Sequence, residues 1–311
     1  MPPFPSCRPA LLTGACLALV AGCGNSSDAK SDENVSQTPA ASSKVTVVAS
    51  TNVYGDIVEQ IGGGKVAVTS VISDPDQDPH SYEANTQNQL ALSKAKLVVE
   101  NGGGYDDFID RMLKSSNSSA EVINAVKVSG KTAPKGGELN EHVWYDFPTA
   151  ARIADRTATA LGKAEPADAA TFTKNAEIFK AKLKPLEAKE AQIKKVHGGE
   201  AIAVTEPVPL YMTEAGGLVN KTPEEFSKAV EEGSDVSPEV LQATLALFTG
   251  KQVKALVYNA QTSGPQTEKI EQAAKAAGIP VVPVTETLPK GKDYIGWMTS
   301  NVDALADALN K

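Results

Sequence analysis

PADAATFTKNAEIFKAKLKPLEAKEAQIKKV, residues 166–196, is the stretch that decides how we expect the chain to fold. It is rich in Ala, Lys, Glu and Leu and contains no glycine. Its apolar side chains recur at helical spacing, at Phe172, Ala176, Phe179, Leu183 and Leu186. A kink is expected at Pro185, because proline lacks the N–H that a helix uses. A helix of about thirty residues is roughly 45 Å long, enough to run the height of two lobes.

Strand and helix patterns alternate on both sides of this segment. Before it, strands are predicted at 44–50, 66–72 and 97–99, and helices at 53–61, 87–95 and 105–113. After it, strands are predicted at 201–204, 255–258 and 279–284, and helices at 238–249, 267–277 and 293–309. Alternation of this kind is typical of parallel sheets covered on both faces. We therefore predict an α/β fold, with two βα lobes with parallel sheets (44–165 and 198–311) bridged by one long helix (166–197).

The first 43 residues have a different character. Residues 10–19 form an apolar run that is too short to span a bilayer and has the length of a signal-peptide core. The run ends in Val20-Ala-Gly-Cys23, which resembles the lipobox of bacterial lipoproteins, so 1–22 is predicted to be a signal peptide and Cys23 an acylated residue; the alternative is a plain secretory peptide cut near Ala21 and Gly22. Residues 23–43 have too few apolar side chains to order themselves and are predicted to form a tether.

The charge and the cysteines exclude several classes of function. The formal net charge is −8, and the lysines are scattered among acidic residues, which argues against nucleic acid as a partner. Of the three cysteines, Cys7 and Cys16 lie in the predicted signal peptide. The mature chain would keep Cys23 alone, so neither a disulfide nor a thiolate metal site is expected.

Two of the three histidines stand where a ligand site is expected. His80 follows the predicted strand at 66–72, and Glu206 and Glu286 follow strands in the second series, where ligands gather in open α/β sheets. His142 occupies a comparable loop before a helix. Two imidazoles and two carboxylates suit a divalent ion such as Mn²⁺, Zn²⁺ or Fe²⁺. From the spacing alone, solvated surface histidines fit these loops as well.

Several motifs, in order along the chain, carry a resemblance to a known family. They are Pro79-His-Ser-Tyr-Glu83, His142-Val-Trp-Tyr-Asp146, Val-Thr-Glu206, Tyr258-Asn-Ala-Gln-Thr-Ser263 and the segment 294–309. From Lys44 onward, the chain resembles the metal-specific solute-binding proteins of ABC uptake systems, the zinc and manganese receptors often called TroA-like.

This resemblance implies a ligand set for the bound cargo, Zn²⁺ or Mn²⁺. His80, His142, Glu206 and Glu286 fall where the family's four ligands fall. The third position is His in many zinc-type members and Glu in many manganese-type members; here it is Glu206. The fourth is usually Asp, and Glu286 is one methylene longer. The His-rich loop of many zinc receptors is missing, since 130–141 holds no His.

Two acids close to the histidines in the sequence each have two possible roles, and the third histidine has a structural one. Glu83 and Asp146 either orient the ring N–H groups of the histidine ligands or cap helices. His197 is expected at the C-terminus of the long helix, where the helix dipole favours it, and not in the metal site.

The function implied is capture of a metal ion outside the cytoplasm and delivery to an ABC transporter permease. The protein would be a monomer, lipid-anchored at the cell membrane, and not an enzyme. The long helix would limit opening of the lobes, and binding should weaken below about pH 6, because imidazole ligands must be neutral. The alternative is a metal-dependent hydrolase with an open His80, His142 and Glu206 site, in which Glu286 would not be a ligand. For an adhesin-like role the sequence shows no dedicated segment.

Overall fold

A computed structural model describes residues 44–74, 77, 82–83 and 85–311. These residues belong to one compact unit, 42–311, which is described here by itself. The predicted signal peptide, Cys23, the tether and His80 lie outside the described residues.

The first sheet has four parallel strands in the order β2-β1-β3-β4. The strands are β1 (Val45–Thr51), β2 (Val66–Ile72), β3 (Leu97–Glu100) and β4 (Glu121–Asn124). Its helices are α1 (Asn52–Gly62), α2 (Thr86–Lys94), α3 (Asp107–Ser116) and α4 (Ala125–Ser129), with a 3₁₀ turn at Gly63–Lys65. All of β3 and all of β1 except Thr46 are buried, as expected for strands in the middle of a sheet covered on both faces.

The second sheet repeats this arrangement, in the order β6-β5-β7-β8. The strands are β5 (Ala201–Val204), β6 (Val219–Asn220), β7 (Leu256–Asn259) and β8 (Val281–Val284). The helices are α7 (Leu210–Ala215), α8 (Glu224–Glu231), α9 (Pro238–Thr249), α10 (Pro265–Ala276) and α11 (Tyr294–Leu309). In both sheets the second strand lies on one side of the first and the third lies on the other, so the carboxyl ends of the two central strands form the switch point where ligands bind in open α/β sheets.

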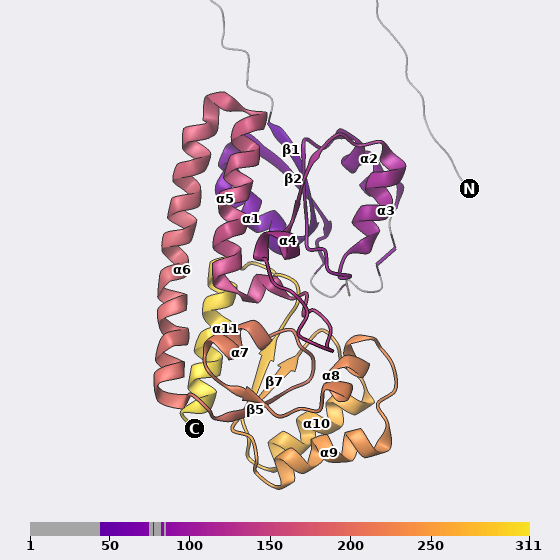
Figure 1. Ribbon diagram of the computed structural model, residues 1–311, viewed down its shortest axis with the longest axis vertical. Coiled ribbons are helices and arrows are strands. Elements are labelled where there is room, and N and C mark those ends of the chain that lie inside the picture. The colour runs from indigo at the N-terminus through magenta and orange to yellow at the C-terminus, as the bar shows by residue number, and fades with distance from the viewer. Residues whose placement is uncertain (1–43, 75–76, 78–81, 84) are drawn as a thin grey trace, which may run out of the picture. The chain divides into compact units, whose positions relative to one another are not determined.

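A long helix connects the two sheets. After α5 (Phe147–Ala164) and short 3₁₀ turns at Val143–Tyr145 and Pro166–Asp168, α6 runs over Ala169–His197 and passes Pro185 without ending. It lies alongside α5, α1 and α11, and so accompanies both sheets (Figure 1). All five apolar positions of the predicted stripe are buried. The parallel sheets and the long helix are confirmed.

One apolar core joins the two halves of this unit. It includes Val47 and Val99 from the first sheet, Val204 and Val257 from the second, and Phe179 from α6. A smaller cluster lies between the first sheet and helices α2 and α3, and another between the second sheet and α8, α9 and α10. Each sheet is thus covered on both faces, and their shared core fixes one sheet against the other.

Direct hydrogen bonds reinforce this junction. The Asn52 side chain donates to the Leu288 carbonyl at 2.9 Å and accepts from the Leu288 N–H at 2.9 Å. The Tyr294 hydroxyl donates to the Trp144 carbonyl at 2.5 Å. The Tyr294 bond is buried and the Asn52 bonds are partly buried, and together they join residues of the first half of the unit to residues of the second.

Some elements were not predicted. β4, β6, α4, α7 and α8 are short, between two and eight residues, so periodicity does not reveal them. The helix expected after His142 is α5, whose extent was not predicted. The proposed lobe boundaries stay a prediction. None of the helices among the described residues has both the length and the apolar character needed to cross a membrane.

Candidate metal centre

Three neighbouring strands of the second sheet deliver polar side chains to one edge. Glu206 follows β5 by two residues, Asn259 is the last residue of β7, and Glu286 follows β8 by two residues. Because β5, β7 and β8 are adjacent and parallel, their carboxyl ends meet. Glu206 and Glu286 are both buried, with 2% and 4% of their surface exposed.

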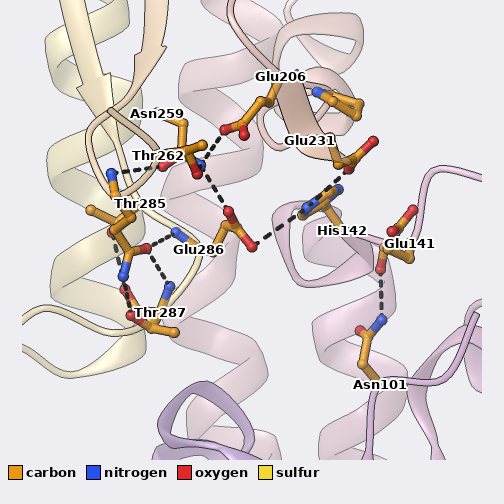
Figure 2. A network of polar contacts seen from close by, with 12 residues as sticks. Asn101, Glu141, His142, Glu206, Glu231, Asn259, Thr262, Thr285, Glu286 and Thr287 are labelled. Carbon is orange, nitrogen blue, oxygen red and sulfur yellow. Dashed lines mark hydrogen bonds and ion pairs between the residues drawn. The ribbon is translucent and has the colours of Figure 1, made fainter. Parts of the chain in front are cut away.

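Asn259 holds these two carboxylates together (Figure 2). Its Nδ2 donates to Glu286 Oε1 at 2.8 Å and also to Glu206 Oε2. One amide group therefore orients two acids that would otherwise repel each other in a region of low dielectric. The two carboxylates are therefore held as a pair by one donor.

Gln261 fixes the loop that carries Glu286. Its Oε1 accepts from the N–H groups of Glu286, at 2.5 Å, and Thr287, at 3.0 Å. Its Nε2 donates to Thr287 Oγ1 at 2.6 Å. The backbone at Glu286 is thus set by a side chain from the loop after β7.

His142 enters from the other side of the site and is fully buried. Its ring packs edge-on against Trp144, with centroids 5.0 Å apart, and against Tyr105, with centroids 5.8 Å apart. Its Nδ1 lies 2.8 Å from Asn140 Oδ1, an acceptor, so Nδ1 carries the ring proton and Nε2 presents its lone pair. That Nε2 lies 4.0 Å from Glu286 Oε2. The structure therefore brings together three of the four predicted ligands.

Asn140 also reaches across to the second sheet. Its Nδ2 donates to the carbonyl of Pro207 at 3.0 Å, next to Glu206 in the chain. Its own carbonyl accepts from the Tyr211 hydroxyl at 2.6 Å. Asn140, which was not predicted as a site residue, thus orients His142 and contacts the loop of Glu206.

The loop after β3 supports the backbone on the His142 side. Gly102, Gly103 and Gly104 all have positive φ, at 76°, 74° and 102°, a region that favours glycine. A Cβ on Gly102 would clash with the Asn124 side chain. Just before this turn, Asn101 Nδ2 donates to the Glu141 carbonyl at 3.0 Å.

Two further acids lie at the site, and neither was predicted. Ligand atoms of Glu141, His142 and Glu231 lie within 4.8 Å of one another. Burial raises the pKa of Glu231 to about 9, with added repulsion from Glu141, Glu206 and Glu286, and burial raises the pKa of Glu141 to about 7. Buried carboxylates that repel one another in this way favour binding of a cation among them. In the sequence, nothing distinguishes Glu231 from the other glutamates of α8.

The residues assigned to supporting roles are placed as follows. Asp146 Oδ2 accepts from the Thr149 N–H at 3.0 Å and so caps α5, and Oδ1 lies 3.2 Å from Lys131 Nζ. Glu83 is exposed. His197 ends α6, with Nδ1 3.2 Å from Glu200 Oε2. His80 lies outside the described residues, so the orienting roles of Glu83 and Asp146 stay predictions.

Comparison with known proteins gives consistent matches over most of the chain. The profile of the family described as ZnuA, zinc-uptake complex component A periplasmic, matches residues 47–308. The manganese-binding lipoprotein MntA of Bacillus subtilis (strain 168) is 26% identical over 303 residues, which cover 93% of this chain and 94% of MntA. The manganese ABC transporter substrate-binding lipoprotein scaA of Streptococcus gordonii is 24% identical, over 89% of this chain and 92% of scaA.

The fold also matches solved structures. The periplasmic zinc-binding protein TroA from Treponema pallidum superposes with a TM-score of 0.72, at 21% identity, over 86% of this chain and 99% of TroA. At that identity the likeness concerns the fold, and it agrees with the two parallel sheets and the long helix described above.

Proposed function

The chain belongs to the ZnuA family of periplasmic zinc-uptake components, and from this premise we propose that it captures a divalent transition metal ion, Zn²⁺ or Mn²⁺, for an ABC permease. Of the relatives named above, MntA is a manganese-binding lipoprotein and scaA is a substrate-binding lipoprotein of a manganese ABC transporter. We assign the ion to His142, Glu206 and Glu286, with His80 as the fourth ligand.

The observation that carries this proposal is the convergence of His142 Nε2 with buried carboxylates. One imidazole nitrogen and the oxygens of Glu206 and Glu286 form a mixed N and O donor set, which suits Zn²⁺ and Mn²⁺. The open-site hydrolase requires Glu286 to lie apart from His142. Glu286 Oε2 is instead 4.0 Å from His142 Nε2. This favours a metal site closed by protein ligands, which suits binding, over a site with an open position, which suits catalysis.

Capture would proceed by exchange of water for protein ligands. The ion loses its hydration shell as it enters between the carboxyl ends of the two sheets, and the carboxylates held by Asn259 neutralise its charge. The α6 helix and the shared core would restrict opening to a small rotation, after which the permease accepts the ion. We further propose that acylated Cys23 anchors a monomer to the cell membrane, which agrees with the lipoprotein names of the relatives.

Metal analysis of protein purified without chelator, followed by competition between Mn²⁺ and Zn²⁺, tests this proposal. His142→Ala and His80→Ala should each lower affinity by roughly a hundredfold, because each removes a proposed ligand atom. His197→Ala is the matched control, since this third histidine pairs with Glu200 at the end of α6. Unchanged affinity in the double variant of His80 and His142 would place the site elsewhere. Substrate turnover that depends on Glu206 would favour the hydrolase.

A further inference from the structure

Glu231, the last residue of α8, directs its carboxylate at the same imidazole nitrogen as Glu286 (Figure 2). Its Oε1 lies 3.7 Å from His142 Nε2, and only 17% of the side chain is exposed. Within the described part of the chain, this buried oxygen accepts no hydrogen bond. No Lys or Arg of the described residues forms an ion pair with it. A buried carboxylate oxygen that accepts no hydrogen bond destabilises the folded protein unless a bound cation interacts with it.

The distances match those between ligands of one ion. Metal–ligand bonds of about 2.0–2.2 Å place two donor atoms of a shared ion roughly 3–4 Å apart. Glu231 Oε1 and Glu286 Oε2 lie 3.7 Å and 4.0 Å from His142 Nε2, respectively. Both oxygens therefore stand at ligand spacing from His142 Nε2.

The next acid in the chain does not share this position. Glu232, the next residue, is exposed, and its carboxylate lies 3.8 Å from Lys228 Nζ. The end of α8 therefore turns one carboxylate inward and the next toward solvent. That contrast provides a matched pair for an experiment.

We propose that Glu231 is a fifth protein ligand, contributed by α8, which favours Mn²⁺ over Zn²⁺; this rests on the proposed function. With Glu231, the proposed ligands include three carboxylates (Glu206, Glu231 and Glu286), and two of them lie beside the imidazole of His142. Zn²⁺ is satisfied by four ligands in tetrahedral geometry, whereas oxygen-rich shells with more ligands suit Mn²⁺. The extra carboxylate therefore contributes more to binding of Mn²⁺ than to binding of Zn²⁺.

Titration of the full mature chain with Mn²⁺ alone and with Zn²⁺ alone, each against a competing chelator, tests this assignment. Glu231→Gln should weaken Mn²⁺ binding by roughly tenfold or more and Zn²⁺ binding by less than about threefold. Glu232→Gln should leave both affinities at the wild-type values. The electron paramagnetic resonance spectrum of bound Mn²⁺ should change in Glu231→Gln and not in Glu232→Gln.

The results separate this proposal from the one on which it rests. Wild-type protein that binds neither ion would overturn the proposed function itself. Wild-type protein that binds both, with Mn²⁺ affinity unchanged in Glu231→Gln or with equal losses for the two ions, would overturn the role of Glu231 alone. If Glu231→Gln fails to fold, Glu231→Asp keeps the charge and withdraws the oxygens by one methylene, and the same selective loss of Mn²⁺ is expected.

Discussion

At the scale of single residues, the site depends on two asparagines that bind no metal themselves. Asn259 pairs Glu206 with Glu286, and Asn140 sets the proton of His142. Both act by presenting a fixed donor or acceptor to a group that must be held in one orientation. Residues that position ligands in this way commonly contribute ten- to a hundredfold to metal affinity.

Replacement of Asn259 by Ala should weaken binding of either ion by roughly tenfold or more, because two buried carboxylates lose their common donor. The unfolding temperature of the metal-free protein should also fall, since the acids then face each other without that donor. Metal titration and thermal unfolding with chelator measure the two effects. Asn310→Ala, at the exposed end of α11, is the control. Equal affinity in Asn259→Ala and wild type would remove Asn259 from the site.

Asn140→Ala and Asn140→Asp should differ in their effect on metal binding. The Ala variant loses the acceptor for His142 Nδ1, so the ring is free to present its proton at Nε2, and affinity should fall by roughly ten- to a hundredfold. The Asp variant keeps that acceptor and should retain most of the affinity, although it loses the bond to the Pro207 carbonyl. Isothermal titration with Zn²⁺ distinguishes the two. Equal losses would assign Asn140 a role in the junction of the sheets only.

At the scale of elements, α6 carries one acid among its apolar contacts. Glu190 is 6% exposed and lies on the buried face with Leu186 and Ile193. Burial raises its pKa from 4.5 to about 8, with repulsion from Asp146 and Glu187 adding to the effect. The folded protein therefore holds a proton at Glu190 over a range in which the unfolded chain has released it.

This proton makes stability depend on pH. Because the pKa is higher in the folded state, the contribution of Glu190 is fully present below about pH 4.5 and is lost as pH rises toward 8. Glu190→Gln keeps the shape and removes the charge, so at pH 9 it should be more stable than wild type by about 1–3 kcal/mol, and by much less at pH 5. Urea unfolding with chelator at both pH values measures the difference. Glu177→Gln, at an exposed position of α6, is the control, and a constant difference between pH 5 and pH 9 would contradict the argument.

At the scale of the whole described unit, one core unites both sheets. Residues of β1, β3, β5 and β7 belong to the same apolar cluster, together with α6 and α11. A shared core raises the free energy of unfolding one half alone, because that would expose apolar surface of the other half. The two halves should therefore unfold together.

Calorimetry should show a single unfolding transition. A bound ion should shift that whole transition to a higher temperature. An ion present at about a thousand times its dissociation constant adds roughly 4 kcal/mol of stability, which corresponds to a rise on the order of 10 °C for a chain of this size. His142→Ala should abolish that rise and His197→Ala should not. Two transitions, of which the ion moves only one, would show that the sheets unfold independently.

The sequence by itself determined the α/β class, the two parallel sheets and the long helix, because these follow from local periodicity that each segment carries alone. It also supplied His142, Glu206 and Glu286 as candidate ligands, through their places after strands or before a helix and through the family resemblance. Only the tertiary structure decided that Asn259 pairs the two acids, that Asn140 reaches the Pro207 carbonyl beside Glu206, and that Glu231 lies beside His142. These contacts join residues 53, 67 and 89 or more positions apart across different elements. Local pattern carries no record of such pairings, because the packing of the two sheets against α6 creates them.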